Sequence, residues 1–302
     1  MGNLTHFSSK SIKAKVVEIG YDQKVKKVLI GENYPLALIG GPCAIESRDH
    51  AFFMAESIGK IVNELNIPWV YKSCYDKDCR SAPESYHGCG LEEGLEILAE
   101  IRKEFGIPVV SDFSDSSWAK ATGEVCDLVQ IPAYLCRQTS ILRAAAETGR
   151  PIHLKKGQFM SPWNMKNSVR KIEAAGGNQI ILADRGTFFG YNSLVNDYRS
   201  LTIMAETGYP VCYDATHSIQ NPTSMGNISG GERQFIPSLV RAAAAVGIDA
   251  LFMEIHNDPK NAKSDPNTVI NVKYIKKVLI QAKTIHEQRK ELISNLGVDD
   301  VD

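Results

Sequence analysis

Short runs of apolar, β-branched residues alternate with longer amphipathic segments eight times along this chain, and this alternation constrains the fold more than any other feature of the sequence. Such runs are typical of buried parallel strands, and the segments between them are typical of the helices that connect parallel strands. The expected strands are residues 36–40, 69–73, 108–112, 128–131, 152–155, 179–183, 211–214 and 250–254. Eight units of this kind predict an α/β fold, a closed (β/α)8 TIM barrel.

An open, doubly wound sheet shares this alternation, but it usually carries a glycine fingerprint between its first strand and first helix. The chain reads Gly-Gly-Pro at residues 40–42, directly after the first expected strand, and this does not match that fingerprint. The connecting segments have helical periodicity, as at residues 91–101, where leucine and isoleucine recur every three or four positions. The closed barrel is therefore the preferred interpretation.

The segment before the first unit has a different pattern. Residues 14–19 and 25–30 are β-branched runs that flank the turn-like residues 20–22. We therefore expect a β-hairpin over about residues 14–30 that covers one end of the barrel. The barrel itself is expected at about residues 36–290.

Two further segments depart from the repeating pattern. Residues 220–231 are rich in Gly, Ser, Asn and Pro, which predicts a long mobile loop after the seventh strand. The acidic end of the chain, about residues 296–302, is expected to be disordered. No linker or internal repeat divides the chain, so we expect a single domain over residues 1–302.

The composition excludes several classes of protein. A net charge of -1 without a basic run does not suit a nucleic-acid partner. The apolar runs are too short to span a membrane and the first 15 residues lack the apolar core of a signal peptide, so we expect a cytoplasmic protein without a membrane partner. The seven cysteines are odd in number and lack zinc-ribbon spacing, so we expect thiols, one of which could serve as a metal ligand.

Functional side chains of a (β/α)8 barrel gather at the carboxyl ends of its strands. Polar residues follow all eight expected strands of this chain, which is more than chance placement would give. In strand order they are Cys43 and Glu46; Lys72, Cys74 and Lys77; Asp112; Gln130; Lys155, Lys156 and Gln158; Asp184 and Arg185; Asp214 and His217; Glu254, His256 and Asp265.

Four cations among these residues form one candidate site, made of Lys72, Lys77, Lys155 and Arg185. Around one barrel mouth they would repel one another unless a multiply charged anion lay among them, and a phosphorylated carboxylate has the required charge. Each lysine taken alone is usually a solvated surface charge, so the interpretation depends on their convergence.

A second candidate site combines a thiol, an imidazole and two carboxylates, from Cys43, His217, Glu254 and Asp265. They come from the first, seventh and eighth units, which are neighbours in a closed barrel. Mixed sulfur, nitrogen and oxygen donors suit zinc, iron, cobalt or manganese better than magnesium or calcium. The alternative is that Cys43 is a small buried side chain and His217 a core histidine.

Six sequence motifs resemble those of the 3-deoxy-D-manno-octulosonate 8-phosphate synthase family and occur in the same order along the chain. The resemblance is to its metal-dependent class in particular, which has cysteine where the metal-independent class has asparagine, and it runs from about residue 13 to residue 288. The motifs are GGPCAIES (40–47), QIPAYLCRQT (130–139), KKGQF (155–159), DRG with FGYN (184–186 and 189–192), DATHS (214–218) and FME with SD (252–254 and 264–265).

This resemblance implies a (β/α)8 barrel, commonly a homotetramer, that condenses phosphoenolpyruvate with D-arabinose 5-phosphate and water. The products are 3-deoxy-D-manno-octulosonate 8-phosphate and phosphate, and the implied cofactor is one divalent transition metal, Zn, Fe, Mn or Co. The implied metal ligands are Cys43, His217, Glu254 and Asp265. The implied substrate-binding residues are Lys72, Lys77, Arg80, Ser81, Asp112, Lys155, Gln158 and Arg185. The implied catalytic residues are Lys72, Lys155, His217 and Asp265.

The chain departs from the family pattern at three positions. Cys79 stands where the family has an asparagine, Cys74 where serine is usual, and Ser114 where the family has a histidine. At position 79 the amide of asparagine is thereby replaced by a thiol, which is a weak hydrogen-bond donor. These positions lie near the acceptor rather than near phosphoenolpyruvate, so the identity of the acceptor sugar stays open.

Three alternative functions are weighed against this interpretation. A heptulosonate-type synthase performs the same chemistry on a shorter aldose phosphate, but its Lys-Pro-Arg-Thr motif is absent. A Schiff-base aldolase would use Lys155 as its nucleophile, without a metal. A catalytically silent paralogue would not need to retain both candidate sites.

Overall fold

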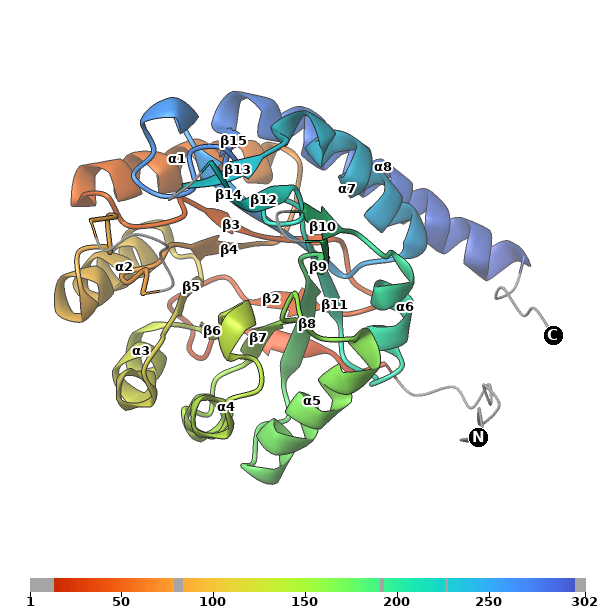
Figure 1. The fold of residues 1–302 in the computed structure, drawn as a ribbon, viewed down its shortest axis with the longest axis horizontal. Helices are drawn as coiled ribbons and strands as arrows, with labels where there is room; N and C mark the ends of the chain where they lie inside the picture. The colour runs from red at the N-terminus through yellow and green to blue at the C-terminus, as the bar shows by residue number, and fades with distance from the viewer. Residues whose placement is uncertain (1–13, 79–83, 191–192, 226–227, 297–302) are drawn as a thin grey trace.

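The computed structural model describes residues 14–78, 84–190, 193–225 and 228–296 of the chain. Eight parallel strands form a closed sheet in the order β11, β8, β7, β6, β5, β4, β3, β14, and β11 pairs again with β14 (Figure 1). Their bounds are β3 (Ala37–Gly41), β4 (Trp69–Lys72), β5 (Val109–Asp112), β6 (Leu128–Ile131), β7 (Ile152–Lys155), β8 (Ile180–Asp184), β11 (Val211–Asp214) and β14 (Ala250–His256). The predicted (β/α)8 barrel is confirmed, and seven of the strands lie within one residue of their expected bounds.

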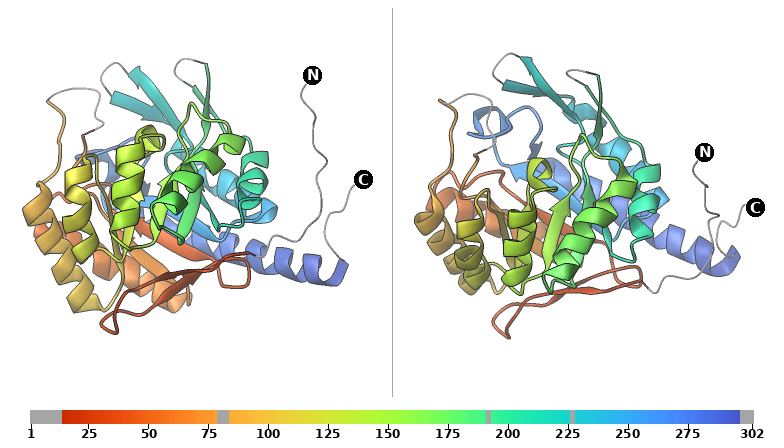
Figure 2. Two further views of the ribbon diagram at one scale, coloured as in Figure 1. Left: turned by 90° about the horizontal axis from the view of Figure 1, so that it is seen from below. Right: turned by 60° about the horizontal axis from the view of Figure 1, so that its bottom comes forward.

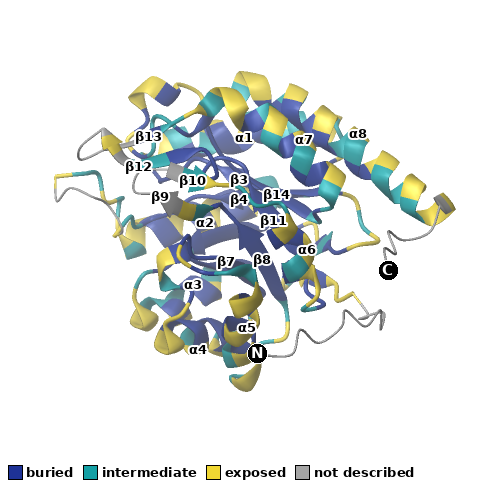
Figure 3. Ribbon diagram, turned by 45° about the vertical axis from the view of Figure 1, so that its right-hand side comes forward, coloured by how far each residue is buried: buried dark blue, intermediate teal, exposed yellow. Residues whose placement is uncertain are grey.

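Helices surround the barrel and bury one face each. They are α1 (Arg48–Glu64), α2 (Leu91–Phe105), α3 (Ala119–Val125), α4 (Thr139–Glu147), α5 (Met165–Ala174), α6 (Arg199–Ala205), α7 (Ile236–Val246) and α8 (Val272–Leu296). In α2, Leu95, Leu98 and Ile101 are buried, and their spacing of three places them on the inner face. Figure 3 shows the same division, with buried strands inside and exposed residues along the outer helical faces. No helix among the described residues is both long and apolar enough to cross a membrane.

The eighth strand closes the barrel, and its register determines which residues meet. β14 pairs with β3 from Ala250↔Ala37 to Glu254↔Gly41, and with β11 at Phe252↔Asp214. Parallel strands end at the same edge of a sheet. The closure therefore brings together the carboxyl ends of the first, seventh and eighth barrel strands, which are far apart in the sequence.

The amino-terminal hairpin covers the opposite end of the barrel. β1 (Val17–Ile19) pairs antiparallel with β2 (Val28–Ile30), as the sequence predicts. The buried side chains of both strands form one apolar cluster with residues inside the barrel, among them Val70 and Leu128. Figure 2 shows this hairpin across the amino-terminal end of the barrel, with two other hairpins at the far end. Apolar side chains thus fill the amino-terminal opening.

The two hairpins at the carboxyl end were not predicted. β9 (Thr187–Gly190) pairs with β10 (Ser193–Val195), and β12 (Gln220–Met225) pairs antiparallel with β13 (Ile228–Gly231). Residues 220–225 and 228–231 are therefore strands, and the expectation of a long mobile loop at residues 220–231 is wrong. The sequence does contain a hairpin signal, because Gly-Asn at residues 226–227 is a dipeptide that suits a two-residue β-hairpin turn. A short strand β15 (Ile270–Asn271) extends the sheet beside β14.

The six cysteines among the described residues are all free thiols, as expected. Cys79 and the acidic tail from residue 297 onward lie outside the described residues.

A buried histidine lies in the barrel interior beneath the carboxyl end. His153 is fully buried on β7, its Nδ1 is 2.9 Å from Gln130 Oε1, and its ring stacks on Phe252. Burial, and next the charge of Lys155, lowers the pKa of His153 to about 3. The folded protein therefore holds this ring neutral at pH values where the unfolded chain protonates it.

We predict that His153 makes the fold sensitive to mild acid. Between the unfolded-state pKa of about 6.5 and the folded value, only the unfolded state takes up this proton, so stability falls as pH decreases through that range. At pH 5 this amounts to about 2 kcal/mol. The loss of unfolding free energy between pH 7.5 and pH 5, measured by urea titration, should be about 2 kcal/mol smaller in His153→Asn.

The matched control is His87→Asn, which removes an exposed histidine. An equal acid sensitivity in wild type and in His153→Asn would contradict the prediction.

Candidate active site

The lysines predicted to bind an anion are buried against carboxylates at the carboxyl end of the barrel. Lys72, only 1% exposed, donates from Nζ to Glu254 Oε1 at 2.9 Å and to the Cys43 carbonyl at 3.2 Å. Lys77 Nζ lies 3.6 Å from the same Glu254 oxygen. Lys155 Nζ lies 2.7 Å from Asp214 Oδ2. The structure thus brings the three lysines into one buried charge network.

The lysines are not uncompensated, as the sequence suggested, because the chain itself supplies Glu254 and Asp214 as counter-ions. Repulsion among the lysines alone therefore does not demand a bound anion.

A stronger indication of an anion site comes from Arg185. It donates from Nη2 to Gln220 Oε1, but its Nε is buried without a hydrogen-bond partner among the described residues. Because buried polar groups are nearly always hydrogen-bonded in native proteins, this donor is suited to an anionic ligand. Gln158, 1% exposed, has a buried Oε1 that also lacks a partner in the described part of the chain, and this oxygen can only accept a hydrogen bond.

The thiol and the carboxylates of the predicted metal site also converge. Donor atoms of Cys43, Glu254 and Asp265 lie within 4.8 Å of one another, and Cys43 Sγ is 3.2 Å from Asp265 Oδ2. His217 Nε2 lies 3.5 Å from Glu254 Oε2, which is buried without a hydrogen-bond partner among the described residues. Three of the four predicted ligands therefore cluster, and the fourth, His217, lies beside Glu254.

Local backbone features place two of these donors. A Cβ atom at Gly41 would lie 2.2 Å from the Lys72 carbonyl oxygen, so glycine is needed where the chain leading to Cys43 passes β4. Asp265 has a positive φ of 49°, a conformation that aspartate tolerates better than most residues. Its carbonyl accepts from the backbone N–H of Thr268 and of Val269, which holds this turn in place.

The electrostatic environment favours the charged form of the Glu254 carboxylate and the neutral form of the Cys43 thiol. Burial would raise the pKa of Glu254, but Lys72 and His217 hold it well below its usual range. Burial, and next the Glu254 charge, raises the pKa of the Cys43 thiol well above its usual range. A cation among these donors would reverse the effect on the thiol, because a coordinating thiol is deprotonated.

Asp112, expected to bind substrate, faces the lysines at the end of β5. Burial would raise its pKa, but Lys72 and Lys77 lower it. Its Oδ1 accepts a hydrogen bond from the thiol of Cys74, the residue that stands where serine is usual. Asp112 therefore belongs to the same charge network. Arg80 and Ser81, expected to bind the acceptor phosphate, lie outside the described residues.

Two residues outside the predicted set connect its members. Gln220 accepts from Arg185 and lies 3.4 Å, through Nε2, from Asp265 Oδ1. Asp214 accepts from Lys155 and from His217. The sequence placed Asp214 at a strand end but gave it no role, and Gln220 lay in the segment mistaken for a loop.

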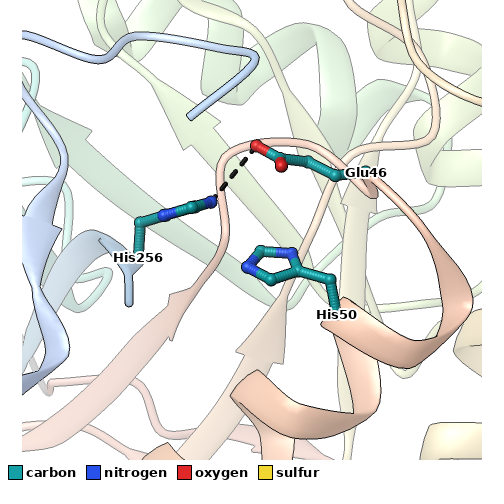
Figure 4. A group of neighbouring side chains, drawn as sticks. All are labelled: Glu46, His50 and His256. Atoms are coloured by element: carbon teal, nitrogen blue, oxygen red, sulfur yellow. Dashed lines mark ion pairs between the residues drawn. The ribbon is translucent and has the colours of Figure 1, made fainter. Parts of the chain in front are cut away.

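A further group of Glu46, His50 and His256 lies beside this site (Figure 4). His256 Nδ1 accepts the backbone N–H of Asp258 at 2.9 Å, so the neutral ring carries its proton on Nε2, 3.2 Å from Glu46 Oε1. A metal ligand needs a lone pair at that nitrogen. The group is therefore better described as a histidine–carboxylate contact between the loop after β3 and the end of β14.

Proteins of known name match this chain over most of its length. The model of the DAHP synthetase I family matches residues 11–292. The chain belongs to the DAHP synthetase I family. A 2-dehydro-3-deoxyphosphooctonate aldolase from Protochlamydia amoebophila is 49% identical over 263 residues, 87% of this chain and 96% of that protein. Proteins of the same name from Rickettsia bellii and Rickettsia felis are 47% identical over 268 residues, 89% of this chain and 98% of each relative.

These matches confirm the relationship that the sequence motifs indicate. The assignment to a metal-dependent class within the DAHP synthetase I family remains a prediction.

We predict that Glu254→Gln destabilises the fold by about 3 kcal/mol when a chelator is present. The substitution leaves buried Lys72 without its carboxylate, and removing one partner of a buried ion pair is strongly destabilising. Urea unfolding with EDTA measures the effect. Glu287→Gln, which removes an exposed ion pair with Lys283, should change stability by less than about 1 kcal/mol. A Glu254→Gln variant as stable as wild type would show that the lysine does not depend on this charge.

Proposed function

We propose that this chain condenses phosphoenolpyruvate with D-arabinose 5-phosphate and water to give 3-deoxy-D-manno-octulosonate 8-phosphate and phosphate. The observation that carries the proposal is the buried cation cluster of Lys72, Lys155 and Arg185, whose Arg185 Nε has no hydrogen-bond partner among the described residues, beside the Cys43 donor set. Relatives named 2-dehydro-3-deoxyphosphooctonate aldolase, matched over nearly their whole length, support the same chemistry.

The cations would bind and orient phosphoenolpyruvate. Lys72, Lys155 and Arg185 can hold its phosphate and carboxylate, and Gln158 can donate from its amide. Its C3 then bonds to the aldehyde carbon of the sugar while water adds at C2. The resulting hemiketal phosphate expels phosphate, which leaves the ketone of the ulosonate. Fixing both substrates in line contributes much of the acceleration in such reactions.

The donor set of Cys43, His217, Glu254 and Asp265 fits one divalent transition metal. The unpartnered Glu254 Oε2 and the mixed thiol, imidazole and carboxylate chemistry support zinc, iron, manganese or cobalt. When bound, such an ion supplies Lewis-acid chemistry toward a carbonyl or a water molecule. His217 is better placed as a ligand than as a proton shuttle, because Asp214 already occupies its Nδ1.

The environment of Lys155 argues against a Schiff-base aldolase. Its ammonium contacts a carboxylate oxygen at 2.7 Å and lies 3.5 Å above the centre of the Phe252 ring. The Lys155 nitrogen is thus engaged by Asp214 and Phe252, whereas a Schiff-base nucleophile needs a lone pair free to attack a carbonyl.

We also propose that the chain assembles with copies of itself, as a homotetramer. Exposed aromatic side chains lie in the segments that connect barrel strands to the helices that follow them, and exposed apolar groups of this kind support an interface. They are Tyr134, Phe159, Trp163, Phe188 and Phe235.

The proposed function predicts chelator-sensitive phosphate release. Purified protein should release phosphate from phosphoenolpyruvate with arabinose 5-phosphate, and EDTA should abolish most of the turnover. Ribose 5-phosphate and erythrose 4-phosphate are the comparison acceptors. Turnover with only one of these two sugars would identify that sugar as the acceptor in place of arabinose 5-phosphate. No release with any acceptor would contradict the proposal.

The metal assignment predicts that Cys43→Ala loses metal and activity together. Removing one of four ligands should lower the bound metal, measured by elemental analysis after dialysis, at least about tenfold. Cys136→Ala, which removes another buried thiol away from this donor set, is the matched control. Full metal content in Cys43→Ala would refute this ligand.

A further inference from the structure

Asp214, at the end of β11, lies between the two candidate sites and has all of its hydrogen-bonding capacity engaged by this chain. It is fully buried, and its Oδ2 is 2.7 Å from Lys155 Nζ and 2.7 Å from His217 Nδ1. Its Oδ1 accepts the backbone N–H of His217 at 2.9 Å and the Thr216 hydroxyl at 3.3 Å. A carboxylate accepts about four hydrogen bonds, so none remains for a substrate.

The contact with His217 determines which nitrogen of that ring is available. A carboxylate at Nδ1 keeps the proton there, so Nε2 carries the lone pair. That nitrogen faces Glu254 Oε2 at 3.5 Å, among the candidate metal ligands. Carboxylates that hold a histidine in this way orient the ring toward a metal and raise its basicity.

The same oxygen also accepts from the ammonium of Lys155. The lysine lies over the face of Phe252, whose ring also packs against His217 at 5.8 Å between ring centres. Asp214 and Phe252 therefore each contact both Lys155 and His217.

We infer that Asp214 is a positioning residue that holds Lys155 toward phosphoenolpyruvate and His217 toward the metal through one shared carboxylate oxygen. The inference rests on the proposed function, since it takes the anion and the metal as the ligands of the two sites. Because one oxygen serves both side chains, its loss should weaken both sites at once. Loss of either Lys155 or His217 alone removes only one.

Asp214→Asn is the informative variant, because the amide keeps the shape but removes the charge that both side chains share. If its oxygen faces Lys155 and His217 Nδ1, both keep an acceptor, but a neutral one, which makes weaker hydrogen bonds than a carboxylate, and its NH2 group opposes the His217 N–H. If it is turned over, the NH2 group opposes Lys155 and His217 Nδ1. In either orientation the hold on both side chains is weakened.

The experiment measures the two affinities separately. Zinc affinity is measured by competition with a chelating dye in the absence of phosphoenolpyruvate, and phosphoenolpyruvate affinity by calorimetry with EDTA present. In Asp214→Asn we expect the zinc dissociation constant to rise about 10- to 100-fold. The phosphoenolpyruvate dissociation constant should rise about tenfold, the size expected for a lost hydrogen bond to a charged group.

Two further variants separate positioning from general damage to the fold. Asp127→Asn removes another fully buried carboxylate that pairs with a cation, Arg102, but lies at the amino-terminal end of β6, and it should leave both affinities unchanged. In a Lys155→Met background, Asp214→Asn should no longer change phosphoenolpyruvate affinity but should still weaken zinc binding.

A change in only one of the two affinities would overturn the shared role of Asp214, and so would equal losses in Asp127→Asn. Those outcomes would leave the proposed function intact. A wild-type protein that binds neither zinc nor phosphoenolpyruvate would overturn the proposed function and this inference together.

Discussion

The pairing of β14 with both β3 and β11 is the constraint on which the rest of this structure depends. It closes the sheet, and it places Glu254 between Lys72 on one side and His217 on the other. These partners are distant in sequence, since Lys72 and Glu254 are 182 positions apart. A barrel that failed to close would expose both the apolar strands and an unpaired set of charges, so folding and site assembly are one event.

The site then faces the general difficulty of burying charge, which is costly unless each charge is paired and hydrogen-bonded. Here the pairing is shared, because Glu254 contacts two lysines, and Asp214 contacts Lys155 and His217. What is left unsatisfied is small and specific: Glu254 Oε2, Gln158 Oε1 and Arg185 Nε are buried without partners among the described residues. A polar network with a few defined openings is suited to ligands that complete it.

The sequence predicted the barrel and the strand ends because periodicity and β-branched composition are local properties. It also predicted which residues converge, since barrel closure follows from the count of strands. It missed what depends on side-chain geometry: the counter-ions of the lysines, the bridging role of Asp214, and the contact of Gln220 with Arg185. It mistook residues 220–231 for a mobile loop because glycine and asparagine, including the Gly-Asn pair at residues 226–227, are common to loops and to tight hairpins.

The hairpin of β1 and β2 has a consequence for the order of events in this protein. Its apolar side chains fill the amino-terminal opening together with residues inside the barrel, so that end offers no passage for a phosphorylated molecule. Everything that reaches Lys155 must enter and leave through the carboxyl mouth. With a single entrance, a molecule that lies deep against this lysine has to arrive before the one that lies above it and cannot depart until the upper one has gone. The closed amino-terminal end thereby imposes an order of binding and release at the carboxyl end.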